Sequence, residues 1–370
     1  MYIKKVKLEN FRNYESQEII FNKNLNNIFG DNAQGKTNIL EAIFICGLGK
    51  SFRTNKDNEL ININKNYSNV EIEYLKKDRD GKIKLELNQK KDFYINDMKV
   101  KKISDILGKI YVVLFTPQDI NILNDDPNTR RRFLNIMISQ LRPMYVHILN
   151  KYKKTLEQRN NYLKQIKYEN KFPEMLEIWD EQLVELGTKI YIYRKEFLEK
   201  INNKIKEIHL VTTQNKENIK IKYKSNIIDE NKYSDELKKR RSLDIQKGYT
   251  TVGVHRDDFD VFINGKNVSV YGSQGQKRSS IISLKLAEAE TIYEEIEEYP
   301  IILLDDFMSE LDKKRINGFI ENIKENQVII TSTEKILLDK NEINYYNVKN
   351  ANIKLDWIFV GPAPKKYIKK

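Results

Sequence analysis

The residues best suited to chemistry form a glycine-rich loop near the start of the chain. Residues 30–37 read Gly-Asp-Asn-Ala-Gln-Gly-Lys-Thr and match the pattern G-x-x-x-x-G-K-[ST] in full. The glycines let backbone N–H groups turn toward phosphates, and the following helix N-terminus adds its dipole. Lys36 is expected to reach the β- and γ-phosphates of ATP, while the Thr37 hydroxyl ligates Mg²⁺. The predicted ATP-binding residues are Gly30, Asp31, Asn32, Ala33, Gln34, Gly35, Lys36, Thr37 and Asn38.

Two aspartates late in the chain could complete this site. Residues 301–304 form a short apolar run that ends on Asp305 and Asp306, as expected of a central parallel strand. Asp305 suits the role of a second Mg²⁺ anchor, and Asp306 could orient or deprotonate the attacking water. Taken alone, a strand ending in two aspartates fits a solvated turn equally well. Combined with the glycine loop, the pattern predicts Lys36, Asp305 and Asp306 as catalytic residues.

A third signal lies at residues 271–278, which read Tyr-Gly-Ser-Gln-Gly-Gln-Lys-Arg directly before a predicted helix. Ser273, Gly275 and Gln276 at the start of that helix could form a second anion site. A simple helix cap followed by a glycine turn explains the same residues as well. The order in the chain favours the anion site, because this segment precedes Asp305 by 32 residues. That order resembles the signature motif of ABC-type ATPases, which completes the nucleotide site of a partner subunit.

Two further segments fit the same pattern. Residues 309–312, Ser-Glu-Leu-Asp, resemble the D-loop that follows the two aspartates in such ATPases. Gln118, directly after Pro117, lies where these proteins carry the glutamine of the Q-loop, and it is a candidate third ligand of Mg²⁺. The match at Gln118 consists of a single residue.

The elements that must position these residues can be predicted from periodicity. Strands are expected at 2–8, 18–21, 26–29 and 110–115, and alternating strands over 69–115 with a turn at Asn96-Asp97. The helix after the glycine loop is predicted over 36–47, since apolar residues recur there at helical spacing. A strand at 301–304, a helix at about 312–325 and a strand at 328–330 give a βαβ unit late in the chain.

Between these halves the character of the sequence changes. Residues from about 119 to 209 combine helical periodicity with dense charge and almost no glycine, without a sustained heptad array. A hairpin is predicted over 258–271 around Asn264-Gly265, followed by a helix from about 276 to 290. The predicted fold is therefore α/β, a P-loop ABC-type ATPase head without a long coiled coil. Its ATP-binding lobe, 1–118 with 296–370, is split by a helical insertion lobe, 119–295, that carries the signature motif.

Composition narrows the classes of function. The chain has a net charge of +12 and a pI of about 9.2, which suits a nucleic-acid partner, although AT-rich codons also favour lysine. No run of apolar residues is long enough to span a membrane, and the N-terminus lacks an apolar signal core, so a cytoplasmic protein is expected. The single cysteine, Cys46, is expected to pack as a small hydrophobe.

Four arginines are candidates for contact with DNA. Arg130, Arg131 and Arg132 stand together at the head of a predicted helix. They could contact DNA phosphates, contact the nucleotide, or form a solvated face, and the sequence does not choose among these. Arg53 is a further candidate for contact with nucleotide or DNA.

The assembled pattern resembles the RecF family of bacterial recombination and gap-repair ATPases along essentially the whole chain. The resemblance rests on LENFRNY (8–14), GDNAQGKTNILEAI (30–43), GKSFR (49–53), TPQDINILNDDPNTRRRFL (116–134), GVHRDDF (253–259), YGSQGQKR (271–278) and LLDDFMSELD (303–312). The heads of this family are similar to those of SMC proteins but lack the long coiled coil. That absence agrees with the compact insertion expected from the sequence.

The resemblance implies a function. It implies a weak, DNA-stimulated ATPase that binds gapped or junction double-stranded DNA, and single-stranded DNA, as an ATP-dependent homodimer. It also implies RecO and RecR as partners in loading RecA onto single strands, with no membrane partner. Three departures from the general ABC pattern suggest slow hydrolysis: Gln274 replaces a glycine of the signature, Asp306 replaces the catalytic glutamate, and Thr331-Ser332-Thr333 replaces the switch histidine.

Two other functions compete with this interpretation. The first is the ATPase subunit of a membrane transporter, in which the loop and the signature motif usually lie about a hundred residues apart. Here Gly30 and Ser273 are separated by 243 residues, and the histidine is absent. The second is a scaffold that binds nucleotide without hydrolysing it.

Overall fold

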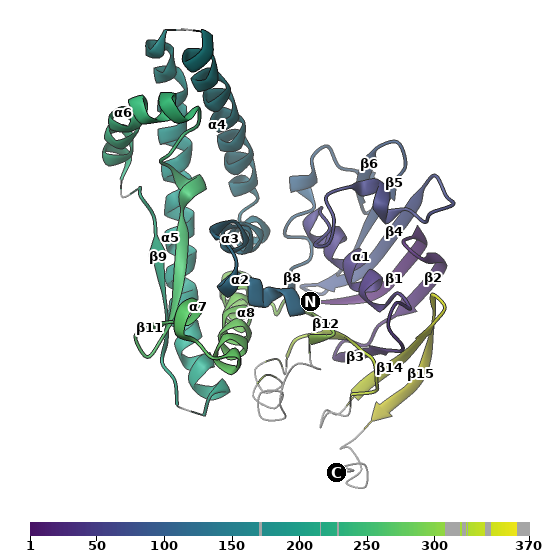
Figure 1. Ribbon diagram of the computed structural model, residues 1–370. Coiled ribbons are helices and arrows are strands. Elements are labelled where there is room, and N and C mark those ends of the chain that lie inside the picture. The colour runs from purple at the N-terminus through teal and green to yellow at the C-terminus, as the bar shows by residue number, and fades with distance from the viewer. Residues whose placement is uncertain are drawn as a thin grey trace. The chain divides into compact units, whose positions relative to one another are not determined.

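The computed structural model describes residues 1–169, 172–214, 216–227, 229–307, 319, 323, 325–336 and 342–360. The chain divides into two units, residues 1–119 with 285–370 and residues 120–284 (Figure 1). The predicted insertion extended to residue 295, whereas 285–295 belong to the first unit. The difference arises because a single helix, α8 (Gln274–Ile296), continues through the boundary at 284 and leaves no loop to mark it. The predicted D-loop, 309–312, and most of the predicted helix at 312–325 lie outside the described residues.

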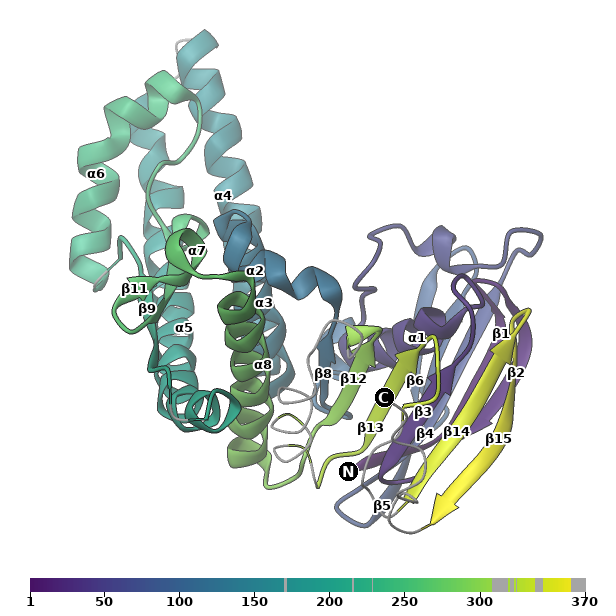
Figure 2. The ribbon, with the colours of Figure 1, turned by 60° about the horizontal axis from the view of Figure 1, so that its bottom comes forward.

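A six-stranded sheet in the first unit carries the predicted catalytic residues. Its order is β15-β14-β3-β13-β12-β8 (Figure 2). The strands are β3 (Leu25–Phe29), β8 (Val112–Phe115), β12 (Ile301–Asp305), β13 (Val328–Ser332), β14 (Glu342–Lys349) and β15 (Asn352–Val360). All except β15 run parallel. The carboxyl ends of β3, β13, β12 and β8 therefore lie along one edge, where ligands bind in sheets of this kind.

A second, antiparallel sheet of the same unit has the order β2-β1-β4-β5-β6-β7. Its strands are β1 (Tyr2–Phe11), β2 (Tyr14–Ile20), β4 (Ser68–Lys76), β5 (Arg79–Leu87), β6 (Lys91–Ile95) and β7 (Met98–Lys99). Buried and more exposed residues alternate along β4, as expected of a sheet with one face on the core. The predicted turn at Asn96-Asp97 is confirmed, with φ of 48° and 65°.

Helix α1 (Lys36–Leu48) packs against strands of both sheets. Its side chains are buried on nearly every face, including Ile39, Leu40 and Ile43, which are fully buried. A helix that is apolar all round belongs in a core, and burial is what fixes its position here. Cys46 is fully buried among these side chains, so its predicted role as a small core residue is confirmed.

The second unit is mainly helical. Its first helices are α2 (Asn121–Asn124), α3 (Pro127–Leu141), α4 (Pro143–Glu169) and α5 (Glu177–Thr212). Helices α4 and α5 lie side by side (Figure 1). A small sheet consists of β9 (Ile219–Lys224), β10 (Asp258–Ile263) and β11 (Lys266–Asn267), and its strand β9 packs against α5. Helix α6 (Glu230–Lys247) also contacts α5. Neither β9 nor α6 was predicted from the sequence.

The predicted hairpin at 258–271 is shorter than expected. The turn at Asn264-Gly265 is present, with φ of 48° and 80°. The returning strand ends at Asn267, because its side-chain oxygen accepts a hydrogen bond from the Ser269 N–H at 2.9 Å. That cap starts the short helix α7 (Val268–Tyr271), which leads directly to the signature segment.

One buried arginine ties three helices of the second unit together. Arg159 of α4 is fully buried, and it donates to Asp180 of α5 at 2.6 Å and to Asp244 of α6 at 2.8 Å. Thr250 accepts a further bond at 2.8 Å. Buried charges are tolerated only when paired in this way, so the contacts fix how the three helices pack.

Candidate nucleotide-binding site

The glycine loop has a backbone conformation that only certain residues can adopt. Gly30 and Gly35 have φ of 150° and 109°, in the region that favours glycine. A side chain at Gly30 would place its Cβ 2.4 Å from the carbonyl oxygen of Val348 in β14. The packing of the loop against β14 therefore requires glycine at this position. Ala33, between them, also has a positive φ, of 63°.

Residues outside the motif hold the loop in place. Asn13, in the turn between β1 and β2, donates from Nδ2 to the Gln34 carbonyl at 3.1 Å and accepts from Asn38 at 2.7 Å. Tyr14 donates to the Gly35 carbonyl at 3.2 Å, and the Gln34 side chain accepts from the N–H of Asn350 at 2.6 Å. These supporting residues were not predicted, although Asn13 and Tyr14 lie within the segment 8–14 that resembles the RecF family. Two strand turns distant in sequence thus shape the loop.

Lys36 is buried, and its ammonium group donates to the carbonyls of Gly30 and Asp31 at 2.5 and 2.8 Å. Burial lowers its pKa, while Asp306, Asp305 and Asp31 oppose the shift. The lysine is therefore folded back over its own loop, with acidic groups close by. A phosphate entering the loop would replace these carbonyls as its partner.

Two of the three predicted Mg²⁺ residues, Thr37 and Asp305, meet at the edge of the parallel sheet. The Thr37 hydroxyl donates to Asp305 Oδ1 at 2.7 Å, and Thr331 at the end of β13 donates to the same atom at 2.9 Å. Burial raises the pKa of Asp305, while the bonds from Thr37 and Thr331 oppose the shift. Hydroxyl and carboxylate oxygens suit Mg²⁺, which prefers a few protein ligands completed by phosphates and water. Within the described ranges, no group of three or more His, Cys, Asp and Glu side chains could hold a metal by itself.

Thr331 also fixes the backbone of the next aspartate. Asp306 has a φ of 50°, unusual for a residue with a side chain, and its N–H donates to the Thr331 hydroxyl at 2.9 Å. Gln118 follows β8, the neighbour of β12, in a short turn of 3₁₀ helix, Pro117–Ile120, and it is exposed. The structure thus brings Lys36, Thr37 and Asp305 together and places Gln118 and Asp306 after the ends of adjacent strands.

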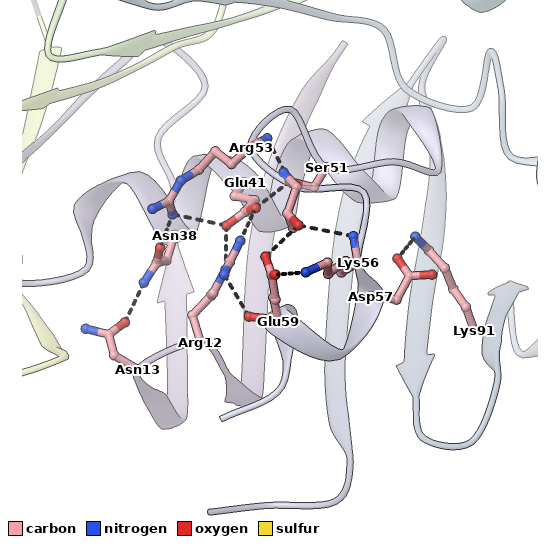
Figure 3. Close-up of polar contacts among 11 residues, drawn as sticks. Arg12, Asn13, Asn38, Glu41, Ser51, Arg53, Lys56, Asp57, Glu59 and Lys91 are labelled. Atoms are coloured by element: carbon pink, nitrogen blue, oxygen red, sulfur yellow. Dashed lines mark hydrogen bonds and ion pairs between the residues drawn. The ribbon is translucent and has the colours of Figure 1, made fainter. Parts of the chain in front are cut away.

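A buried glutamate on α1 organises two arginines beside the loop (Figure 3). Glu41 is fully buried, and Arg12 forms two bonds to its carboxylate, at 2.9 and 2.7 Å. Ser51 and Arg53 complete the group, at 2.5 and 3.3 Å from the two oxygens. Arg53 also donates to Asn38 at 2.7 Å, and its side chain remains 43% exposed. Arg53, the candidate for contact with DNA or nucleotide, therefore lies beside the first turn of α1.

The signature segment forms a capped helix start in the second unit. Ser273 is exposed, its hydroxyl accepts from the Gln276 N–H at 3.2 Å, and the Gln276 side chain accepts from the Ser273 N–H at 3.0 Å. This reciprocal pair is a capping box. Gly275 lies in the same turn, and its carbonyl accepts from Ser279 at 3.0 Å.

Two arginines of the cluster form hydrogen bonds with other residues of the chain. Arg130 forms two bonds to Asp258 and two to backbone carbonyls, and its side chain is only 12% exposed. Arg131 donates to the Asp257 carbonyl and to Asn128. These contacts join α3 to β10, which accounts for Arg130 and Arg131 without DNA or nucleotide. Arg132 also has interactions within the chain.

Comparison with known proteins places the chain in a family. The family model described as the RecF/RecN/SMC N terminal domain matches residues 2–354. The DNA replication and repair protein RecF of Acetivibrio thermocellus is 42% identical over 351 residues, 92% of this chain and 95% of that protein. The protein of the same name from Clostridium acetobutylicum is 42% identical over 364 residues, 95% of this chain and 99% of that one. The chain belongs to the RecF family. The predicted resemblance is confirmed.

Solved structures agree with this assignment. A structure of the recombination mediator protein RecF with ATP, of the RecFOR pathway, has a TM-score of 0.88 at 36% identity and covers 96% of this chain and 97% of that one. A Smc head bound to the C-winged helix domain of ScpA has a TM-score of 0.57 at 16% identity, covers 97% of this chain and 98% of that one, and shows the fold alone. The predicted P-loop ATPase head of the ABC and SMC type is therefore confirmed. The described helices contain no long coiled coil.

RecF membership removes the transporter interpretation, because the relatives are proteins of DNA replication and repair. Among the helices that the structure describes, none combines the length and the apolar character needed to cross a membrane.

The contribution of the Glu41 hydrogen bonds to the stability of the fold can be tested by mutation. Glu41→Gln keeps the size of the side chain but removes the charge that pairs with Arg12 and Arg53. The free energy of unfolding should fall by about 2 kcal/mol, the scale of hydrogen bonds to a buried charged group. Urea unfolding measures this, with the partly exposed Glu73→Gln as a control expected to change it by less than about 0.5 kcal/mol. Equal effects of the two variants would show that the group around Glu41 is not a structural anchor.

Proposed function

We propose that the chain is a slow, DNA-stimulated ATPase of recombinational gap repair that binds DNA as an ATP-dependent dimer. The observation that carries the proposal is the meeting of Thr37, Asp305 and Thr331 beside a glycine loop that holds Lys36. Membership of the RecF family, in which a relative is solved with ATP, supports the same conclusion. The expected partners are gapped double-stranded and single-stranded DNA, together with RecO and RecR, in the cytoplasm. The dimer would help these two proteins to load RecA.

The residues of the loop would share the work of binding. Lys36 would move from the carbonyls of its own loop to the β- and γ-phosphates of ATP. Mg²⁺ would be held by Thr37, Asp305 and Gln118, and it would offset charge on the phosphates. Asp306 would orient the attacking water and accept its proton. Its side chain is one methylene shorter than that of the usual glutamate. The shorter reach of Asp306 supports slow hydrolysis.

Ser273 would complete the site of a second copy of the chain. Its hydroxyl accepts the N–H of Gln276, so the hydroxyl proton remains available to a phosphate oxygen. ATP carries a γ-phosphate that Lys36 of one copy and Ser273 of another could bind together, whereas ADP lacks it. ATP would therefore favour the dimer through its stronger binding to that state.

The distribution of charge supports DNA binding by the second unit. Residues 120–284 contain 31 Lys and Arg against 21 Asp and Glu, a net charge of +10, and the rest of the chain carries only +2. A bias toward lysine codons would act on both units, so it does not explain the difference. Lys238 and Lys239 on α6 are among the exposed cations of this unit. Because Arg130 and Arg131 are used in contacts within the chain, the proposed phosphate contacts lie elsewhere on the helical surface.

The nucleotide part of the proposal is tested at two positions. Lys36→Met should abolish ATP binding, because the phosphates lose their main cation. Asp306→Asn should bind ATP normally but hydrolyse it about a hundredfold more slowly, the usual range for loss of a general base. Equilibrium binding of a fluorescent ATP analogue and phosphate release measure the two effects. Lys99→Met and Asp80→Asn change exposed residues of the same unit and should leave both quantities unchanged.

Three results would count against the nucleotide part. ATP affinity of Lys36→Met equal to that of the native chain would contradict the phosphate loop. Hydrolysis by Asp306→Asn at the native rate would contradict the role of Asp306. A native chain that binds ATP and never releases phosphate, with or without DNA, would favour the scaffold.

The DNA part is tested by salt dependence. Binding to gapped duplex should weaken steeply between about 50 and 200 mM salt. The double variant Lys238→Glu/Lys239→Glu should reduce the slope of log affinity against log salt by about 2, since each phosphate that is no longer neutralised lowers it by about 0.9. Lys101→Glu/Lys102→Glu changes the same charge on an exposed segment of the first unit and should leave the slope unchanged. An equal loss of slope for the two double variants would contradict a preference of DNA for the second unit.

A further inference from the structure

A glutamate that lies far from the signature motif in sequence contacts the first turn of helix α8. Glu217, just before β9, accepts a hydrogen bond from Gln276 Nε2 through Oε1 at 2.9 Å. Its other oxygen, Oε2, lies 3.3 Å from Nε2 of His209, in the last turn of α5. The side chain is 20% exposed, so it connects the buried end of α5 with the exposed start of α8.

The histidine on the buried side contacts α8 through one of its ring nitrogens. His209 is fully buried, and its Nδ1 lies 2.9 Å from the hydroxyl of Ser283 on α8. Burial lowers the pKa of His209, although the neighbouring Glu217 opposes the shift. Nε2 lies near Glu217 without completing a hydrogen bond, so this contact is an electrostatic one. Glu217 thus lies between a buried histidine and the exposed first turn of α8.

On the exposed side, the contact fixes which way the Gln276 amide faces. With Nε2 bonded to Glu217, the amide oxygen is left to accept the Ser273 N–H, as observed at 3.0 Å. The Gln276 backbone N–H in turn holds the Ser273 hydroxyl at 3.2 Å. Glu217 therefore fixes the Gln276 side chain, and that side chain holds the backbone N–H of Ser273, the residue that carries the hydroxyl.

We propose that Glu217 is a positioning residue that orients Ser273 toward the γ-phosphate bound by a second copy of the chain. This inference rests on the proposed function, because it gives the capped turn a task in the dimer. This role of Glu217 explains why the first turn of α8 is hydrogen-bonded to a carboxylate in addition to being capped. A cap alone needs only Ser273 and Gln276.

The consequence of removing Glu217 can be stated for each step of the proposed cycle. Without its acceptor, the Gln276 amide is held only by its bond to the Ser273 N–H, and ordering it fully on dimerisation costs free energy. The missing bond is one to a charged group, so the ATP-induced dimer should dissociate about tenfold more readily. ATP binding by the monomer should not change, because the loop at 30–37 lies in the other unit.

The experiment compares Glu217→Ala with Glu185→Ala. Glu185 is an exposed residue of α5 in the same unit and pairs with Lys189 at 2.6 Å, which makes Glu185→Ala a matched loss of one carboxylate. Sedimentation with ATP should show the dimer dissociation constant raised about tenfold for Glu217→Ala and unchanged for Glu185→Ala. The affinity of both monomers for a fluorescent ATP analogue should equal that of the native chain.

A second variant separates positioning from stability. Gln276→Ala removes the same bond from its exposed side, together with the bond to the Ser273 N–H, and leaves Glu217 beside His209. It should weaken the dimer at least as much as Glu217→Ala does, and adding Glu217→Ala to it should change little further, since the bond between Gln276 and Glu217 is already lost. Glu217→Gln should dimerise nearly as the native chain does, because its amide oxygen can still accept a hydrogen bond from Gln276.

The outcomes distinguish this inference from the function on which it rests. Ser273→Arg is measured alongside, and a normal ATP-induced dimer in that variant would overturn the proposed site shared between two copies. If Ser273→Arg blocks dimerisation while Glu217→Ala behaves like Glu185→Ala, the shared site stands and the positioning role of Glu217 is wrong. Fully additive effects of Glu217→Ala and Gln276→Ala would also overturn it.

Discussion

The nucleotide site depends on one carboxylate oxygen that two threonines share. Oδ1 of Asp305 accepts hydrogen bonds from Thr37, at the start of α1, and from Thr331, at the end of β13. Three segments far apart in the sequence are joined at the carboxyl edge of the parallel sheet by these two bonds. The order β3-β13-β12 makes this possible, because β13 lies between the strand of the loop and the strand of the aspartates. The fold thus brings together a lysine, a hydroxyl and a carboxylate of the kinds that bind phosphate and Mg²⁺.

The sequence predicted those parts of the site that are encoded locally. The glycine loop, its preceding strand and its following helix were identified because their residue types and spacing are dictated by backbone geometry within a few residues. The aspartates were found because a short apolar run ending in charge is characteristic of a central strand. Thr331 was noticed only as a departure from the usual histidine. Its contacts with Asp305 and Asp306 depend on the order of strands in the sheet, which no local pattern specifies.

Other misses have the same physical origin. Asn13 contacts the loop across a turn between two strands, and Glu217 contacts the signature turn from 59 positions before Gln276. Strand β9 and helix α6 were missed in a segment where charged residues dominate and tertiary packing decides the structure. The unit boundary within α8 was misplaced by 11 residues because the helix is continuous there. Arg130 resembled a surface cation in the sequence, yet its contacts with Asp258 make it part of the packing between α3 and β10.

The central claim is that one ATP is bound by the loop of one copy and Ser273 of another. Its most direct test mixes two variants that are defective in opposite halves of the site, Lys36→Met and Ser273→Arg, in equal amounts with ATP. Neither variant should dimerise alone, since each lacks one half of every site. The mixture should sediment partly as a dimer, because the loop of Ser273→Arg and the serine of Lys36→Met complete one site. A mixture that remains monomeric, at concentrations well above those at which the native chain dimerises with ATP, would contradict the shared site.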